Sequence, residues 1–359
     1  MKDTLRVGVI GSGAISNTYL ENMINRQPVL DVKGVCSAHV ENARKKAAEF
    51  GLPACTTEEM LADPDIDMVV ILTPVETHFD LIKRALLAGK HVYTEKTMTV
   101  TLEQANELMA LADEKGLLLC SAPDTFLGKG LQTARKAIDD GLLGDIYSFS
   151  IACNRCNDVL TAYFPFLRAP GAGALRDYMV YYLTALMSLL GPADKVSAFV
   201  EAPIKSRMNN LPGSRNFGEE IQTPNESIIA ATMRLKSGVV GTIHENNESL
   251  MVDRSDFIIY GTKGILLLGD PNQFESPVRL LTNGERFSLK EETLPAVDGG
   301  VGRGIGPADM AKAILEGRTP RASKELAGHV LEIIEAMEES AASGTMVTLK
   351  TSFEQPAAL

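Results

Sequence analysis

An apolar strand, a glycine turn and the start of a helix follow one another within residues 7–16, which read VGVIGSGAIS. Gly11 permits the tight turn, and Gly13 lets backbone N–H groups approach a pyrophosphate because it has no Cβ atom. An anion there would lie at the N-terminus of a helix expected to run to about Arg26. Ser16 replaces the third glycine of the usual pattern. A plain strand–helix connection has the same appearance, so the motif needs support from the rest of the chain.

Strands and helices alternate through the first third of the chain. We expect strands at 31–37, 68–72, 91–94 and 117–120, and helices at 40–50, 77–88 and 101–115. The unbroken apolar run at 68–72 suits a strand that is buried on both faces of a parallel sheet. Thr101 and Gln104 have the spacing of a capping box. This alternation predicts a doubly wound parallel sheet with ligands at the carboxyl ends of its strands.

Polar and glycine residues fall at several of these strand ends, which favours a dinucleotide crevice at that edge of the sheet. The residues expected to bind the dinucleotide are Gly11, Ser12, Gly13, Ala14, Ile15, Ser37, Thr73, Pro74, His78, Glu95 and Lys96.

The end of the second strand bears on the choice between NAD and NADP. An acidic residue there would bind the adenosine ribose, but the strand ends at Ser37, and Asp31 lies at its other end. The small hydroxyl of Ser37, with His39, Arg44 and Lys45 nearby, leaves room for a 2′-phosphate, so we expect NADP over NAD. Alternatively, the two basic side chains belong to the solvated face of a helix.

Length and charge limit the classes of protein. A chain of 359 residues suggests two domains, for which we expect 1–122 and 123–359. The net charge of −11 argues against nucleic acid or an anionic membrane as a partner. No apolar run is long enough to span a bilayer, and residues 1–6 leave no room for a secretory signal. The five cysteines fit a reducing compartment, so we expect a soluble cytoplasmic protein.

Five motifs, in this order, carry a resemblance to a known family. They are TPVETH at 73–78, YTEK at 93–96, GAGALRDYMVYYL at 171–183, YGTKG at 260–264 and RGIGPADM at 303–310. The chain resembles, over essentially its full length, the glucose–fructose oxidoreductase/inositol dehydrogenase/rhizopine-catabolism (Gfo/Idh/MocA) family.

The resemblance implies a Rossmann domain followed by an α+β domain with a large, open and mostly antiparallel sheet. The sequence pattern agrees, because a helix is expected at 128–140 and a strand at 146–152. Two hairpins are also expected, of strands 227–235 and 238–244 and of strands 256–260 and 264–268. An open sheet needs its exposed face covered, so we expect a homodimer or homotetramer.

The resemblance also implies three catalytic residues. The matching lysine, Lys96, contacts the substrate hydroxyl in the family, and desolvation of a lysine beside a nicotinamide lowers its pKa into the working range. Thr97 replaces the family's proline, which typically follows a cis peptide bond, so the Lys96–Thr97 bond is left open as cis or trans. Asp177 orients the substrate or partners Lys96. Tyr181 takes the place of the acid–base histidine of many members, as in some relatives.

Both chemical assignments have simpler alternatives. Lys96 could be a surface lysine paired with Glu95. A phenol has an ordinary pKa near 10 and is a poor base, although a neighbouring lysine cation would lower that value and couple the two groups. Tyr178, Tyr181 and Tyr182 could instead form a packing cluster at the start of a helix.

Other positions are weaker candidates for substrate contacts. These are Asp124, Phe126, Asn154, Arg155 and Tyr163, together with His244-Glu245 at the end of a strand, which could face the pocket or a subunit interface. Cys153 and Cys156 form a lone C-x-x-C without two further zinc ligands nearby, so we expect no metal.

These features favour an NAD(P)-dependent oxidoreductase that moves a hydride between C4 of the nicotinamide and a carbinol or carbonyl carbon. The substrate would be a sugar, a polyol or a sugar derivative. One alternative is a glycosidase-like enzyme that uses tightly bound NAD in a redox cycle, as some relatives do. Another is a non-catalytic dinucleotide-sensing regulator, because the family includes a repressor.

Overall fold

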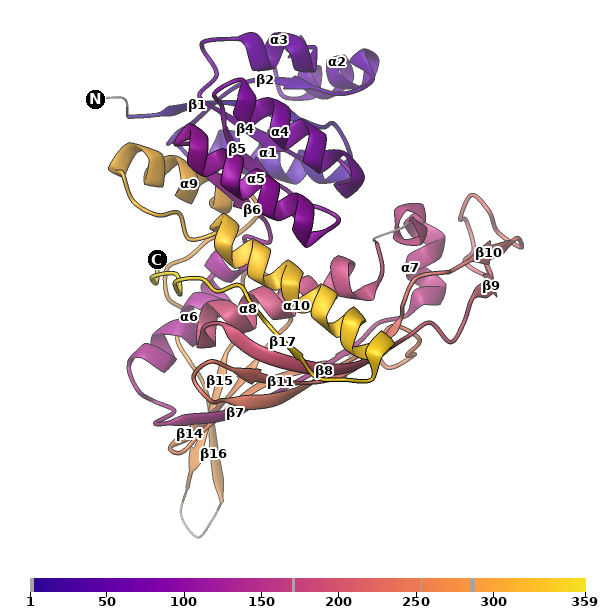
Figure 1. Cartoon of the computed structure of the whole chain (residues 1–359), viewed down its shortest axis with the longest axis vertical. Coiled ribbons are helices and arrows are strands. Elements are labelled where there is room, and N and C mark those ends of the chain that lie inside the picture. The colour runs from indigo at the N-terminus through magenta and orange to yellow at the C-terminus, as the bar shows by residue number, and fades with distance from the viewer. Residues whose placement is uncertain (1–2, 170–171, 253, 285–287) are drawn as a thin grey trace. The chain divides into compact units, whose positions relative to one another are not determined.

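The chain forms two compact units in a computed structural model that describes residues 3–169, 172–252, 254–284 and 288–359 (Figure 1). The first unit comprises Met1–Gly128, Gly299–Leu331 and Leu359, and the second comprises Lys129–Asp298 and Glu332–Ala358. The segment Gly299–Leu331, which the sequence assigns to the second domain, therefore belongs with the first unit.

A six-stranded parallel sheet forms the centre of the first unit, with the order β3-β2-β1-β4-β5-β6. Its strands are β1 (Leu5–Ile10), β2 (Leu30–Cys36), β3 (Ala54–Cys55), β4 (Met68–Ile71), β5 (His91–Thr94) and β6 (Leu119–Ser121). Its helices are α1 (Ala14–Arg26), α2 (Val40–Glu49), α3 (Thr57–Ala62), α4 (His78–Leu87), α5 (Leu102–Lys115) and α9 (Ile305–Glu316), with 3-10 turns η1 (Val75–Thr77) and η2 (Thr125–Leu127). This sheet confirms the predicted doubly wound fold.

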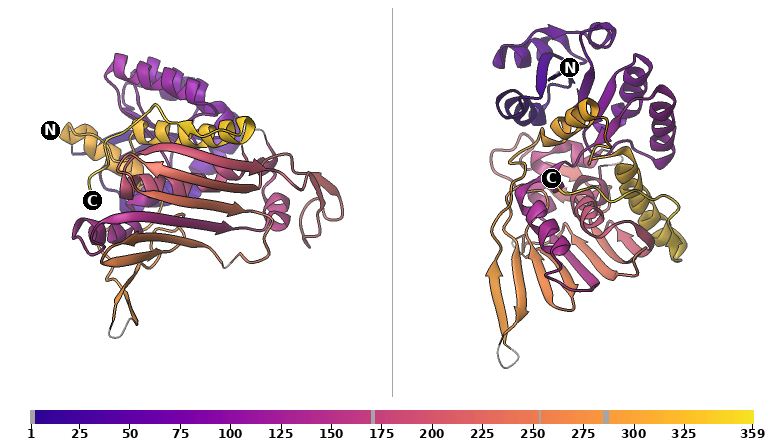
Figure 2. Two further views of the ribbon diagram at one scale, coloured as in Figure 1. Left: turned by 60° about the horizontal axis from the view of Figure 1, so that its bottom comes forward. Right: turned by 90° about the vertical axis from the view of Figure 1, so that its left-hand side faces the viewer.

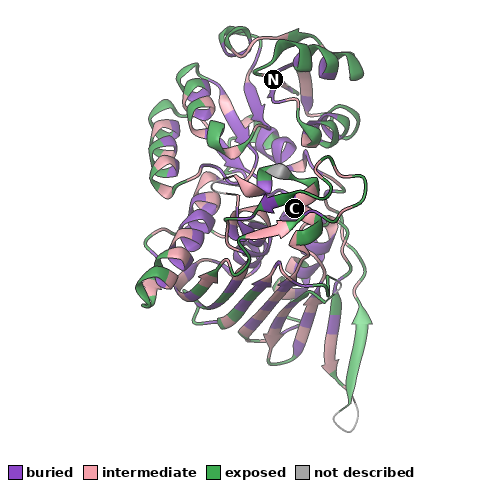
Figure 3. Cartoon of the chain, turned by 90° about the vertical axis from the view of Figure 1, so that its right-hand side faces the viewer, coloured by how far each residue is buried: buried purple, intermediate pink, exposed green. Residues whose placement is uncertain are grey.

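Burial and capping explain why these segments fold as they do. All four residues of β4 are fully buried, as expected of a strand covered on both faces (purple in Figure 3). Helix α3 was not predicted, although Thr56 and Glu59 form a capping box in which each side chain accepts a hydrogen bond from the other's backbone N–H. At α5 only half of the predicted box is present: Thr101 accepts from the Gln104 N–H.

Asp124 joins the late segment to the first unit. Its fully buried carboxylate accepts hydrogen bonds from the backbone N–H groups of Gly304 (3.0 Å) and Gly306 (3.1 Å), at the start of α9. The Arg303 guanidinium lies 3.4 Å from the other carboxylate oxygen. Burial raises the pKa of Asp124, and Arg303 opposes this. The side chain therefore caps a helix, which differs from the substrate contact that we expected.

The second unit is built on a nine-stranded sheet in the order β16-β15-β14-β13-β7-β12-β11-β8-β17. Its strands are β7 (Ile146–Asn154), β8 (Ala193–Glu201), β11 (Ile228–Leu235), β12 (Val240–Asn246), β13 (Asp256–Gly261), β14 (Gly264–Leu268), β15 (Arg279–Asn283), β16 (Leu289–Thr293) and β17 (Val347–Thr348). Only β7 and β12 pair in parallel, and both predicted hairpins are present as β11–β12 and β13–β14. The expected α+β fold with a mostly antiparallel sheet is confirmed.

Short elements and helices complete the second unit. They are α6 (Lys129–Asp139), α7 (Asn157–Tyr163), the 3-10 turn η3 (Pro165–Arg168), the π-helix η4 (Leu175–Met179), α8 (Val180–Leu190), the two-stranded ladder of β9 (Ser206–Met208) and β10 (Glu220–Gln222), and α10 (Lys324–Ser343), whose first turns belong to the first unit.

One face of the nine-stranded sheet carries helices, and the other face, among the described residues, carries none (Figure 2, left). Residues along β11 alternate between buried and exposed, as expected for a sheet with one solvent-exposed face. Phe199 and Val240, which share the face of the exposed residues of β11, are both at least half exposed. Within the described ranges, no helix is both long and apolar enough to cross a bilayer.

We expect Asp124→Ala to lower the free energy of unfolding by about 3 kcal/mol or more, because it removes the helix cap and leaves Arg303 buried without its carboxylate. The matched control is Asp140→Ala, which removes an exposed pair with Lys136 and should cost less than about 1 kcal/mol. Equilibrium denaturation measures both. Equal stability of the two variants would contradict the role of Asp124.

Candidate active site

The glycine turn after β1 is held by backbone contacts on one side and is open on the other. The Gly11 N–H donates to the Cys36 carbonyl (2.8 Å), and Gly11 has a φ of +120°. A Cβ atom on Gly11 would lie 2.8 Å from the Leu72 backbone, whereas one on Gly13 would meet no atom within 4 Å. The buried Ser16 hydroxyl donates to the Gly13 carbonyl (2.6 Å). The turn therefore leaves space for a phosphate at the N-terminus of α1.

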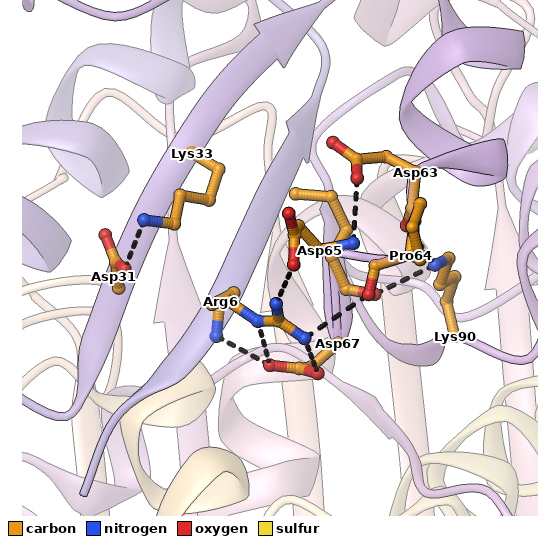
Figure 4. Close-up of polar contacts among 9 residues, drawn as sticks. Arg6, Asp31, Lys33, Asp63, Pro64, Asp65, Asp67 and Lys90 are labelled. Atoms are coloured by element: carbon orange, nitrogen blue, oxygen red, sulfur yellow. Dashed lines mark hydrogen bonds and ion pairs between the residues drawn. The ribbon is translucent and has the colours of Figure 1, made fainter. Parts of the chain in front are cut away.

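The end of β2 carries no carboxylate, as predicted. Ser37 is half-buried there, and Asp31 forms an ion pair with Lys33 at 2.5 Å. That pair lies with Arg6 and Asp67 at the amino end of the sheet (Figure 4), away from the glycine turn. Asp31 is therefore not placed to bind a ribose.

The two basic residues after β2 lie on the exposed side of α2. Arg44 and Lys45 are both exposed, and Arg44 pairs with Glu41 at 2.7 Å within the same helix. The alternative of a solvated helix face therefore describes them better than a preformed phosphate site does.

Lys96 follows β5 and is partly exposed between two buried neighbours, Glu95 and Thr97. The Glu95 carboxylate accepts hydrogen bonds from the Lys96 backbone N–H (3.0 Å) and from the Tyr19 hydroxyl on α1 (2.7 Å). The Lys96–Thr97 peptide bond is cis, which answers the question left open by the missing proline. The helix that begins at the glycine turn thus also contacts the strand end that carries the lysine.

His78 is fully buried at the start of α4, where its ring lies between two backbone carbonyls. Nδ1 is 2.9 Å from the Thr97 oxygen, and Nε2 is 2.8 Å from the Thr73 oxygen. Burial lowers the pKa of His78, while the two carbonyls and Glu95 act in the opposite direction. Both ring nitrogens are occupied, so His78 is not placed to contact the cofactor directly, in contrast to our expectation. Thr73 is partly exposed and Pro74 exposed beside it.

In the second unit, Asp177 lies in the π-helix between the glycine run and α8. Its carboxylate forms an ion pair with Arg155 (2.8 Å), whose guanidinium carbon lies 3.9 Å from the centre of the Tyr178 ring. The Tyr178 hydroxyl donates to Asp270 (2.8 Å). A π-helix is rare and is found frequently at functional sites. Neither the π-helix nor the Asp270 contact could be read from the sequence.

Tyr181 is in the first turn of α8 and is only 6% exposed. Its ring centre is 5.8 Å from that of Tyr178 at an interplanar angle of 61°, and Tyr182 packs on Phe257 at 5.9 Å. The three tyrosines therefore do pack together. Burial raises the pKa of Tyr178 and of Tyr182, so these two phenols stay neutral.

Glu245, which we expected at a strand end facing the pocket or a subunit interface, is fully buried on β12, next to Cys153 of β7. Burial raises its pKa well above the usual value, and the charge of Arg155 opposes this only in part. His244 is exposed, because successive strand residues face opposite sides. The Glu245 carboxyl is therefore buried near the Arg155–Asp177 pair.

A small polar pocket opens beside Asp177 within the second unit. Its lining includes Arg155, Asn157, Thr161, Asp177, Glu226 and Asn247. A Cβ atom on Gly173 would lie 1.9 Å from the Glu226 carboxylate, so the glycine run has a steric reason at this position. Gly171, the first residue of that motif, lies outside the described residues.

Two family profiles match the chain. One, described as "Oxidoreductase family, NAD-binding Rossmann fold", matches residues 5–122, and the other, "GFO/IDH/MocA C-terminal domain", matches residues 131–267. The two profiles describe the N-terminal and the C-terminal domain of one family. The chain belongs to the GFO/IDH/MocA family. It is therefore an NAD(P)-binding oxidoreductase, as the resemblance implied.

Individual relatives agree with this family. The chain is 33% identical over 193 residues to "Uncharacterized oxidoreductase YdgJ" of Escherichia coli (strain K12), a match that spans 53% of this chain and 55% of that protein. It is 24% identical over 363 residues to "scyllo-inositol 2-dehydrogenase (NADP(+)) IolW" of Bacillus subtilis (strain 168), covering 97% of each. The structure "Levoglucosan dehydrogenase, complex with NADH" shares the fold, with a TM-score of 0.82 at 23% identity over 97% of this chain and 100% of that one.

Among the substrate positions suggested by the sequence, Arg155 lies beside Asp177. Asn154 instead donates to the Arg254 carbonyl at the end of β7, and Tyr163 is 60% exposed beside Phe164. Phe126 is buried in the first unit. Asn154 thus holds the backbone and Phe126 packs, roles that the sequence does not distinguish from ligand contacts. The substrate contact expected of Tyr163 stays a prediction.

The C-x-x-C pair is not bonded: Cys153 is buried and Cys156 half-buried, both as free thiols. Within the part of the chain that the structure describes, no three or more His, Cys, Asp or Glu residues are grouped so as to hold a metal ion.

We expect Gly13→Ala to weaken dinucleotide binding at least about tenfold, because the added methyl group occupies the space left for the phosphates, while stability changes by less than about 0.5 kcal/mol. Gly11→Ala should instead lower stability by about 1–3 kcal/mol, because alanine is strained at this φ and meets the Leu72 backbone. Nicotinamide fluorescence titration and chemical denaturation measure the two effects. Unchanged binding by Gly13→Ala would exclude the turn as the phosphate site.

Proposed function

We propose that the protein transfers a hydride between C4 of the nicotinamide and a carbinol or carbonyl carbon of a sugar, polyol or sugar derivative. The proposal rests on the position of Lys96. This residue follows β5 in the dinucleotide-binding sheet, and its backbone N–H donates to the Glu95 carboxylate. The relatives named as dehydrogenases of scyllo-inositol and levoglucosan support this class of substrate.

The proposed chemistry divides the work among three side chains. A dinucleotide bound at the glycine turn would supply the chemistry of hydride transfer. Lys96 hydrogen-bonds the reacting oxygen, Asp177 orients the substrate, and Tyr181 moves a proton with Lys96 as a coupled pair. Arg155 holds Asp177 in one orientation by the 2.8 Å ion pair. The resemblance supplies these roles, and the partial exposure of Lys96 and the pocket beside Asp177 are compatible with them.

NADP is the proposed cofactor of choice. The end of β2 offers Ser37 and no acid to repel a 2′-phosphate. The name of IolW includes NADP(+), whereas the levoglucosan dehydrogenase structure contains NADH. Arg44 adds little support, since it already pairs with Glu41.

A homodimer or homotetramer is proposed as the assembly. The support is the face of the nine-stranded sheet on which Phe199 and Val240 are exposed. The absence of nucleic-acid partners and the cytoplasmic location stay predictions from charge and cysteine content.

We expect NADPH to bind at least about tenfold more tightly than NADH, which corresponds to about 1.4 kcal/mol. The measurement is a fluorescence titration with each dinucleotide, followed by addition of sugars, polyols and their keto forms. Substrate-dependent oxidation or reduction of the cofactor would support the proposal. Turnover with no net cofactor change would favour the glycosidase-like alternative, and tight binding without turnover the dinucleotide sensor.

We expect Lys96→Ala and Tyr181→Phe each to reduce kcat by about 10²–10⁴-fold, because each removes a group that moves the substrate proton. Dinucleotide binding should stay nearly unchanged in both. The matched control is Tyr182→Phe, which removes the hydroxyl of the next tyrosine, whose ring packs on Phe257. If Tyr181→Phe is as active as the control, Tyr181 only packs. Unchanged turnover by Lys96→Ala would remove the lysine from the mechanism.

A further inference from the structure

His78 connects two loops that the proposed chemistry depends on. Thr73 follows β4, and Thr97 directly follows Lys96. The imidazole spans the gap between them, at 2.8 Å from the Thr73 carbonyl oxygen and 2.9 Å from the Thr97 carbonyl oxygen. The ring is fully buried, so water does not compete for either contact.

The Thr97 carbonyl belongs to the residue that directly follows the lysine. The rest of this loop is also held by backbone acceptors, because Thr97 donates through its hydroxyl to the Thr99 carbonyl (2.9 Å) and Thr99 donates to the Thr101 carbonyl (2.8 Å). Before Lys96, the Glu95 carboxylate accepts from the lysine N–H. The contact from His78 Nδ1 therefore completes the support of the lysine backbone on its C-terminal side.

The protonation state of the imidazole decides which of the two carbonyls it donates to. A neutral imidazole has one N–H and donates to one carbonyl at a time, whereas an imidazolium donates to both. Glu95 is the charged group whose field favours the imidazolium here, and burial disfavours it. In the neutral form, the tautomer with the proton on Nδ1 binds the Thr97 loop, and the other tautomer binds the Thr73 loop.

We propose that His78 is a positioning residue for Lys96, and that it acts through the hydrogen bond from Nδ1 to the Thr97 carbonyl. The proposal rests on the proposed role of Lys96 in hydride transfer. A displacement of about 1 Å in a reacting group can cost about 10²-fold in rate, so a bond that fixes the lysine backbone affects kcat without touching the substrate.

Two conservative variants separate the two contacts. In His78→Asn the side-chain amide nitrogen lies near the place of Nδ1, and in His78→Gln it lies near the place of Nε2. The asparagine variant therefore keeps the bond to Thr97, and the glutamine variant keeps the bond to Thr73. We expect His78→Asn to retain kcat within a few-fold and His78→Gln to lose at least about tenfold, with similar dinucleotide affinity.

Each variant deletes one hydrogen bond, so a merely structural role predicts a similar loss of stability and a similar kcat for both. Equal kcat values, or a glutamine variant more active than the asparagine variant, would overturn the proposal. Thermal unfolding of both proteins is measured alongside.

A readout independent of turnover keeps this test apart from the proposed function. In backbone amide spectra of the full-length, isotope-labelled protein, we expect the Lys96 and Thr97 signals to stay in place in His78→Asn and to move in His78→Gln. If no carbohydrate is turned over by the unaltered protein, the proposed function fails. These spectra still test whether His78 holds the Lys96 backbone through the Thr97 carbonyl. Signals that do not move in His78→Gln, or that move equally in both variants, would overturn it. Should neither variant fold, the ring nitrogen signals of the unaltered protein decide, because an Nδ1 without a proton would overturn the proposal.

Discussion

Parallel pairing in register is the constraint on which the rest of the first unit depends. Ile10, the last residue of β1, pairs with Cys36 and with Ile71, the last residues of β2 and β4. Ile71 pairs in turn with Thr94, and Thr94 with Ser121, the last residues of β5 and β6. Five strands therefore end at one level. Gly11 and Ser37 follow these ends directly, Lys96 is the second residue after β5, and His78 begins the helix after β4. Backbone hydrogen bonds between the strands therefore bring these residues to one edge of the sheet.

This edge could be predicted because its causes are local. The apolar run of β4 and the glycine turn after β1 can each be recognised from a few consecutive residues, and Lys96 is the second residue after its strand. The hairpins of the second unit were predictable for the same reason. The strand β3, with only Ala54 and Cys55, is too short for any periodicity to show.

The parts that could not be predicted depend on partners far away in the chain. His78 contacts two backbone carbonyls whose positions follow from the register of β4 and β5. Because every residue has a carbonyl, the sequence does not show which ones a side chain will contact. Asp124 binds backbone N–H groups some 180 residues later. Arg155 was a weak candidate until the π-helix placed Asp177 beside it, and the burial of Glu245 depends on the pairing of β12 with β7.

The return of Gly299–Leu331 to the first unit has a consequence for how the protein is made. A ribosome releases the sheet strands of the dinucleotide-binding unit early, but the helix α9 that Asp124 caps arrives only after the whole of Lys129–Asp298 has been synthesised. Until then, the Asp124 carboxylate lacks the Gly304 and Gly306 N–H groups that it binds in the folded protein. The second unit is in this sense an insertion within the first, and the first unit cannot be completed during synthesis before most of the second has emerged.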